Sequence, residues 1–267
     1  MKFSPVKPLL SLAFAAALLP TGAQAASITL TGTIRDFNSF GTTFGGVAGH
    51  PDFEHYLGDD RGIVKTLLGG DGKPVYESAN SNPTVTSAAS FFQWYHDDLS
   101  VNRTGSTSIT LSDIGGGLFQ FASGSYFPID GLLLGQSACC GHNYGFTTEF
   151  HTTFGYDTSV SNTFSFSGDD DVFVFINGIL AIDLGGVHGS ESASVNLNLA
   201  TTAAALGLVT GSNYTLDVFQ AERHTSGSNF TMTTTLGLVS HDAPEPGSLA
   251  LAGLALAALG AARRRRG

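Results

Sequence analysis

Polar and apolar residues alternate along much of the chain between residues 27 and 238. In the segment 27–34 every second residue is polar, as expected for a strand that buries one of its faces. Many short strands separated by glycine-rich turns predict an all-β fold, either a sandwich or a barrel. The same pattern recurs at 108–111, 118–122, 146–154, 163–166, 172–176, 179–184, 194–199, 214–219 and 230–238.

The intervening segments complete the outline of one domain. Asn177 and Gly178 stand between two expected strands, and this dipeptide is a strong signal for a hairpin turn. We expect a short helix at residues 201–206. Residues 36–106 alternate less and are rich in Gly, Asp and Asn, so we expect long loops there. No repeat or flexible linker is visible within residues 26–240, which we interpret as a single domain.

The first 25 residues have the three parts of a secretory signal peptide. Lys2 and Lys7 give a basic start, residues 9–19 are apolar, and Ala23-Gln24-Ala25 fits a cleavage site. The apolar run is shorter than the ~20 residues that a membrane span needs. We therefore expect residues 1–25 to be a helical signal that is cleaved after Ala25 rather than an anchor.

The C-terminal tail, residues 241–267, also has three parts. Pro244, Glu245 and Pro246 precede an uncharged run at 247–262, and four arginines follow at 263–266. The tail closely resembles the PEP-CTERM sorting signal of Gram-negative bacteria. The resemblance implies transient insertion of a transmembrane-like helix into the inner membrane, with the arginines held inside. It also implies that an exosortase-type sorting protease recognises the tail; the alternative is a plain membrane anchor.

Charge excludes one class of partner. The chain has a formal net charge of −10 and only 13% charged residues, about half the usual share. Residues 26–243 contain six basic and 21 acidic residues, a net charge near −15. Nucleic-acid binding requires clustered Lys and Arg, so we expect no nucleic-acid partner.

Three consecutive acids, Asp169, Asp170 and Asp171, separate two expected strands. Adjacent carboxylates repel one another unless a cation or hydrogen-bond donors compensate them, and Ca²⁺ prefers such clustered oxygen ligands. The alternative is an acidic turn that solvent stabilises. The triplet opens Asp169-Asp170-Asp171-Val172-Phe173-Val174-Phe175-Ile176-Asn177-Gly178, and Asp183-Leu184-Gly185-Gly186-Val187-His188 follows.

This segment resembles the core of the fibro-slime domain, and the resemblance extends from about residue 28 to 238. That domain is itself similar to the β-sandwich of the anthrax protective-antigen type, which implies a jelly-roll-like antiparallel sandwich. Among the lectins of that type, paired aspartates bind Ca²⁺, which then holds sugar hydroxyls. The resemblance implies Asp169 and Asp170 as metal ligands. Asn229 joins them by its position in a later loop, and further ligand-binding candidates are Asp171, Asn177, His188, Glu222 and His224. Asp171 departs from the wider pattern, which often has Gly.

Two Glu-x-His pairs form a second group of candidates. Glu149 and His151 are two residues apart and therefore share one face of a strand, and Glu222 and His224 repeat the spacing. With His188 they could form a transition-metal site. We favour a buried hydrogen-bond network, because buried polar groups normally find partners. Adjacent Cys139 and Cys140 leave open a vicinal disulfide, an interchain disulfide or two free thiols.

Together these patterns predict an exported carbohydrate-binding protein of the cell surface or extracellular matrix, assisted by Ca²⁺, in a biofilm or exopolysaccharide setting. The alternatives are a structural matrix protein without a metal site and a glycan-active enzyme. Nucleophile-elbow, zinc-protease and phosphate-loop motifs are missing from the sequence, so we expect no enzyme. Asp97, Asp98 or Glu149 could supply the paired carboxylates that glycoside cleavage needs, but no motif in the sequence supports this role.

Overall fold

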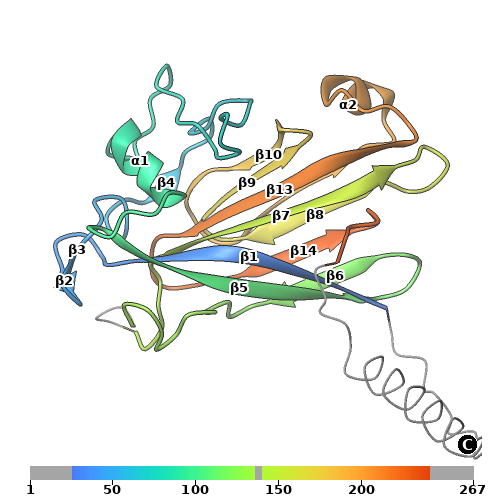
Figure 1. The fold of residues 1–267 in the computed structure, drawn as a ribbon. Helices are drawn as coiled ribbons and strands as arrows, with labels where there is room; N and C mark the ends of the chain where they lie inside the picture. The colour runs from blue at the N-terminus through green and yellow to red at the C-terminus, as the bar shows by residue number, and fades with distance from the viewer. Residues whose placement is uncertain (1–25, 136–139, 241–267) are drawn as a thin grey trace, which may run out of the picture.

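A computed structural model describes residues 26–135 and 140–240 (Figure 1). Ten strands form one antiparallel sheet in the order β10-β9-β13-β7-β1-β5-β6-β14-β8-β12. Their bounds are β1 Ser27–Phe37, β5 Asn102–Asp113, β6 Phe119–Ser123, β7 Phe146–Tyr156, β8 Thr163–Gly168, β9 Asp171–Ile176, β10 Ile179–Leu184, β12 Glu191–Asn196, β13 Ser212–Glu222 and β14 Phe230–Thr234. The prediction of an all-β sandwich is confirmed.

The sheet curves around its main hydrophobic core, so that its edge strands β10 and β12 approach each other. Alternation of side chains explains which residues fill this core. Ile28, Leu30 and Ile34 of β1 are buried, and Phe150 and Phe154 of β7 occupy the corresponding positions on a neighbouring strand. The enclosed aromatic and aliphatic side chains stabilise the sandwich by removing apolar surface from water.

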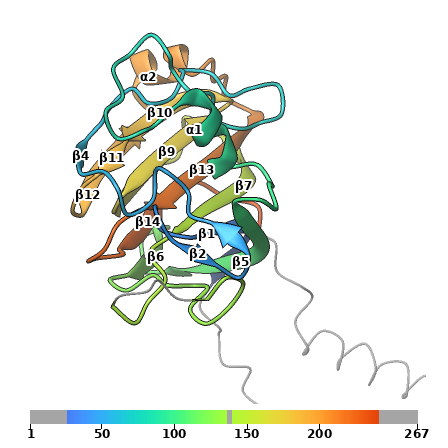
Figure 2. The same cartoon turned by 90° about the vertical axis from the view of Figure 1, so that its left-hand side faces the viewer.

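A second core lies on the outer face of β9 and β13. Helix α1 (Ala88–Trp94) packs there, with Phe91 edge-on to Phe173 and Tyr95 edge-on to Phe219. Figure 2 shows α1 and the surrounding loops in front of these strands. Both faces of β9 are therefore buried, and all six of its residues are inaccessible to solvent.

Short elements complete the fold. β2 (Thr43–Phe44) pairs with β3 (Val47–Ala48), and β4 (Gly58–Asp59) pairs with β11 (Gly186–Val187). Helix α2 (Ala200–Ala205) lies one residue from the expected helix at 201–206. Among the described residues, no helix is long and apolar enough to cross a membrane. The expected signal helix and tail helix lie outside those residues.

The structure corrects several sequence predictions, among them the strand expected at 230–238, which ends at Thr234 as β14. Helix α1 lies within residues 36–106, where we expected loops; Ser87 caps it and forms a capping box with Ser90. Strand β5 is much longer than the expected 108–111. Strand β12 begins and ends three residues earlier than the expected 194–199, since the buried Leu197 already belongs to the turn before α2. The Asn177-Gly178 hairpin is confirmed: both residues have positive φ, 55° and 71°, and connect β9 to β10.

Candidate functional site

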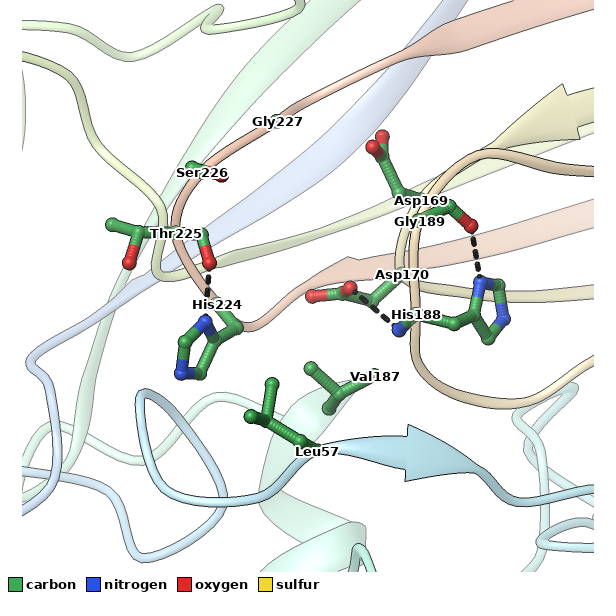
Figure 3. A pocket seen from close by; sticks show the side chains of 10 residues that line it. All are labelled: Leu57, Asp169, Asp170, Val187, His188, Gly189, His224, Thr225, Ser226 and Gly227. Atoms are coloured by element: carbon green, nitrogen blue, oxygen red, sulfur yellow. Dashed lines mark hydrogen bonds between the residues drawn. The ribbon is translucent and has the colours of Figure 1, made fainter.

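A pocket of about 390 Å³ opens where three loops of the sandwich meet (Figure 3). These loops follow β8, β11 and β13, and the segment before β4 closes one side. The lining residues are Leu57, Asp169, Asp170, Val187, His188, Gly189, His224, Thr225, Ser226 and Gly227. Two of the predicted metal ligands and two of the predicted histidines therefore meet in one cavity.

Asp169 is held in place by the loop that follows β13. Its carboxylate accepts hydrogen bonds from the backbone N–H of Asn229 and from Asn229 Nδ2, the latter at 2.9 Å. Gly227 lies so close that a Cβ there would stand 2.9 Å from Asp169 Oδ2. A side chain at position 227 would therefore displace the carboxylate of Asp169. Asn229 therefore lies beside Asp169, with its amide nitrogen toward the carboxylate.

Asp170 faces the loop on the other side of the pocket. Its Oδ1 accepts from the backbone N–H of His188 at 3.1 Å and its Oδ2 from that of Arg223 at 2.9 Å. Only 3% of the residue is exposed. Burial raises the pKa of Asp170 well above its usual range, against the opposing attraction of Arg223. The peptide bond between Asp169 and Asp170 is cis.

Glu222, at the end of β13, is a fully buried acid without a partner. Neither of its carboxylate oxygens has a hydrogen bond among the described residues, and the hydroxyl of Ser228 donates instead to the carbonyl of Tyr126 at 2.7 Å. Burial, and then repulsion from Asp170 and Asp169, raises the pKa of Glu222 well above its usual range. An ionised carboxylate at this place costs free energy unless a positive charge compensates it.

Both ring nitrogens of each pocket histidine contact a nearby carbonyl or carboxylate oxygen. His188 contacts the carbonyl of Gly189 through Nδ1 at 2.8 Å and that of Leu184 through Nε2 at 3.2 Å. His224 Nδ1 bonds the carbonyl of Thr225, and its Nε2 lies 3.6 Å from Glu54 Oε2. Both rings thus brace the walls of the pocket (Figure 3).

Asp171 and Asn177 do not reach the pocket, which corrects two predicted ligand positions. Asp171 has no exposed surface and pairs with Arg223 inside the second core. As the first residue of β9 it points to the opposite face from its neighbour Asp170. Asn177 lies in the turn at the far end of β9, roughly 20 Å along the strand. There its Nδ2 donates to the carbonyl of Leu206 at 2.9 Å.

The first Glu-x-His pair forms a separate network on β7. Glu149 Oε1 accepts from Arg35 at 3.0 Å, and its Oε2 accepts from Lys73 at 2.5 Å. His151 Nδ1 lies 2.8 Å from Asp217 Oδ1. This confirms the predicted hydrogen-bond network at Glu149 and His151. Glu222 and His224 lie apart from it, because Glu149 pairs with Phe219 of β13, three residues before Glu222.

Among the described residues, no three His, Cys, Asp or Glu side chains are placed to hold one metal ion. The transition-metal site considered for the two Glu-x-His pairs, Glu149 with His151 and Glu222 with His224, together with His188 is thus not formed within the part of the chain that the structure describes. Any cation at the pocket would need carbonyl or amide oxygens beside Asp169 and Asp170. Pro244, Glu245, Pro246 and Cys139 lie outside the described residues, and Cys140 is exposed.

The sequence did not single out Arg223 or Glu54. Arg223 is one of few basic residues in an acidic body and adjoins Glu222, which is a weak signal for a buried ion pair. Glu54 has a positive φ of 55°, and its Oε1 accepts from the backbone N–H of Thr225 at 2.9 Å. It therefore fixes the His224 loop from outside the pocket, and no local motif marks it.

Comparisons with known proteins identify two parts of the chain. Residues 137–250 match the family model of the PA14 domain, and residues 242–266 match the PEP-CTERM protein-sorting motif. Residues 137–250 are thus similar to a PA14 domain, and the tail carries a motif that indicates export and sorting in Gram-negative bacteria. The sheet itself extends to β1, β5 and β6, which precede the PA14 match.

Two relatives come from Dictyostelium discoideum. Protein psiR is 38% identical over 204 residues, which is 70% of this chain and 20% of psiR. Protein psiD is 36% identical over 229 residues, which is 80% of this chain and 42% of psiD. The chain spans less than half the length of these curated relatives.

Solved structures show a weaker similarity. The PA14 sugar-binding domain from an RTX adhesin aligns with a TM-score of 0.32 and 7% identity, over 80% of this chain and 99% of that domain. The A domain of epithelial adhesin 9 from Candida glabrata, in complex with Galβ1-3GlcNAc, aligns with a TM-score of 0.29 and 10% identity. The alignment covers 82% of this chain and 85% of the adhesin chain.

Proposed function

We propose that this protein is exported and binds carbohydrate at the cell surface or in the extracellular matrix, using Ca²⁺ in the pocket of Figure 3. The observation that supports the proposal is that Asp169 and Asp170, both buried, line one pocket, while the buried carboxylate of Glu222, which they repel, has no hydrogen-bond partner. The PA14 domain and the sorting motif are consistent with such a role.

The pocket has the oxygen-rich chemistry that Ca²⁺ prefers. In this proposal Asp169 and Asp170 supply carboxylate oxygens, and Asn229, whose Nδ2 donates to Asp169, holds that carboxylate in place. Ca²⁺ takes six to eight oxygen ligands, so backbone carbonyls, water and sugar hydroxyls would complete the shell. Leu57 and Val187 give the cavity an apolar side against which the carbon face of a sugar ring can lie.

A calcium titration followed by thermal unfolding tests the metal. Ca²⁺ at 100 times its dissociation constant would stabilise the fold by about 2.7 kcal/mol. That corresponds to a rise in Tm of roughly 5–10 °C for a domain of this size. The variant Asp170→Asn should lose the shift, and Asp113→Asn, on an exposed strand end, should keep it. An equal shift in both variants, or none in the wild type, would remove Ca²⁺ from the proposal.

A glycan array with and without chelator tests the ligand. We expect the wild type to bind a subset of glycans and to lose them in EDTA, and we expect the exopolysaccharide of the host to bind in the same way. Such binding would place the protein in a biofilm or polysaccharide matrix. Silence on every glycan, including the host polymer, would contradict the proposal.

A structural matrix protein without a metal is the second candidate. One observation favours it: no three His, Cys, Asp or Glu side chains within the described residues are placed to hold one metal ion. In that case Asp169 and Asp170 only fix loops through their hydrogen bonds with Asn229, His188 and Arg223. The calcium titration separates the two candidates.

A glycan-active enzyme is the third candidate, and the state of Glu149 argues against it. Burial alone would raise its pKa, but His151, Lys73 and Arg35 outweigh burial and lower the pKa of Glu149 to about 2. A carboxylate that remains ionised cannot serve as the general acid of glycoside cleavage. Release of free sugar from the host polymer would revive this candidate.

The organisation that fits this function has three parts. Residues 1–25 are removed as a signal peptide, and residues 26–240 form a fibro-slime β-sandwich. Residues 241–267 insert transiently into the inner membrane, where an exosortase-type protease recognises them. Pro246→Ala should retain the protein in the membrane fraction, whereas wild-type protein should reach the surface or medium. Unchanged fractionation would show that sorting does not depend on Pro246.

A further inference from the structure

A loop at residues 66–73 crosses the outer face of the sheet, away from the Asp169 pocket. Its start pairs with β10 and the hairpin turn, through Leu180 N–H to Thr66 O at 2.9 Å and Leu68 N–H to Gly178 O at 3.1 Å. Its end is tied to β7 by the contact of Lys73 Nζ with Glu149. The loop thus spans from the edge of the sheet to its fourth strand.

A groove of about 670 Å³ lies between this loop and the strands. His151 of β7 and Thr215 and Asp217 of β13 form its floor, and Leu67 with the glycine-rich loop forms its wall. Gly72 has a positive φ of 75°, and Leu67 is 58% exposed. The volume is within the range of sites that take small ligands.

The charges of the groove are already paired with one another. His151 contacts Asp217 at 2.8 Å, Lys73 contacts Glu149 at 2.5 Å, and Asp71 contacts His96 Nε2 at 2.9 Å. A cationic or anionic ligand would find no uncompensated charge of opposite sign. An uncharged ligand would leave these pairs intact.

The polar atoms that remain suit hydroxyl groups. Lys73 Nζ keeps donors beyond the one given to Glu149, Asp217 keeps an acceptor oxygen, and Thr215 is exposed and can do both. A sugar hydroxyl also both donates and accepts. The exposed side chain of Leu67 offers an apolar surface for the carbon face of the ring.

We propose that this groove is a second carbohydrate site, which takes a neutral oligosaccharide and needs no metal ion. Asp217 of the groove lies five residues, roughly 17 Å, before the end of β13 at Glu222, and the pocket begins beyond that end at His224. The groove shares no lining residue with the pocket.

The test is a glycan array probed in EDTA with the full chain. The neutral probes are cellotetraose, maltotetraose and chitotetraose, and the anionic probe is tetragalacturonate. We expect Thr215→Arg, which fills the groove, and Leu67→Asp, which makes its wall charged, each to reduce the signal on a neutral probe at least tenfold. Thr110→Arg is the matched control, because Thr110 is exposed on β5. Asp170→Asn should leave the EDTA-resistant signal unchanged.

Three results would overturn the second site: no EDTA-resistant signal on any neutral probe, a signal that both groove variants retain, or a signal confined to tetragalacturonate. The outcome is independent of the function proposed for the pocket. Chelator-sensitive binding that is lost in Asp170→Asn and kept in Thr215→Arg reports on the pocket alone. EDTA-resistant binding lost only in the groove variants supports the second site even if Ca²⁺ has no effect.

Discussion

Asp171 and Arg223 form a two-fold hydrogen-bonded ion pair in which neither side chain has exposed surface. Arg223 Nε donates to Oδ2 at 2.6 Å, and Nη2 donates to Oδ1 at 3.0 Å. The guanidinium also donates to Thr84 O at 2.7 Å and lies over the ring of Trp94 at 4.4 Å. The pair therefore connects the start of β9 to the loops around α1, next to the pocket that Asp170 lines.

Breaking this pair should destabilise the protein strongly. Asp171→Asn or Arg223→Met leaves one buried partner unsatisfied, which costs about 3–5 kcal/mol. Chemical unfolding of both single variants and of the double variant measures the effect. We expect the double variant to lose less than the sum of the two single losses. A loss below about 1 kcal/mol in either single variant would contradict the role of the pair.

The Asp-Asp-Asp triplet shows what the sequence could and could not predict. Side chains alternate sides in an extended chain, so adjacent acids cannot all face one pocket. Local sequence does not say where β9 begins, and its first residue, Asp171, turns to the second core. Its partner Arg223 is 52 residues away, and only the pairing of β13 with β9 brings it near.

The long strands could be predicted from the sequence, whereas helix α1 could not. The long strands β1 and β7 alternate regularly and were predictable, because period-2 burial depends on neighbouring residues alone. Helix α1 has seven residues and buries Phe91 and Trp94, too few for a helical period to show. It forms because Phe173 and Phe219 provide an apolar surface on the outer face of the sheet.

The close approach of Gly227 to Asp169 gives a precise test of the pocket. A Cβ at Gly227 would stand 2.9 Å from Asp169 Oδ2, so Gly227→Ala should displace that carboxylate. We expect the affinity for Ca²⁺ to fall at least tenfold, measured by isothermal titration calorimetry. Gly189→Ala is the control within the same pocket, since a Cβ there meets no atom within 4 Å. Equal affinities in the two variants would show that Asp169 does not hold the ion.

The network on β7 should make the stability of the protein depend on pH in both the acidic and the alkaline range. The pKa of Glu149 is lowered to about 2. The ionised carboxylate therefore contributes fully to the stability of the fold above about pH 4.5, and this contribution is lost as the pH falls towards 2. Hydrogen bonds to Asp217 and Glu149 raise the pKa of His151 to about 9. The charged ring therefore contributes fully to the stability of the fold below about pH 6.5, and this contribution is lost as the pH rises through 9.

Urea unfolding at pH 3, 5.5 and 9.5 measures this dependence. The wild type should be more stable than Glu149→Gln by up to about 3 kcal/mol at pH 5.5, and the difference should shrink at pH 3. His151→Gln should flatten the loss between pH 6.5 and 9.5. The interpretation fails if both variants keep the wild-type pH profile.

Glu222 should destabilise the protein whenever no cation is bound. Its pKa is raised because the buried carboxylate is easier to protonate than to ionise, so the native state keeps a proton that the unfolded chain releases above about 4.5. Stability therefore falls as the pH rises from that value towards the folded pKa. In EDTA at pH 7, Glu222→Gln should raise Tm, and Glu191→Gln, which removes only a half-exposed ion pair with Arg61, should change it little. With Ca²⁺ present, the advantage of Glu222→Gln should shrink, since the ion compensates the carboxylate in the wild type. A variant that is less stable than the wild type in EDTA would show that Glu222 has a partner that matters for folding.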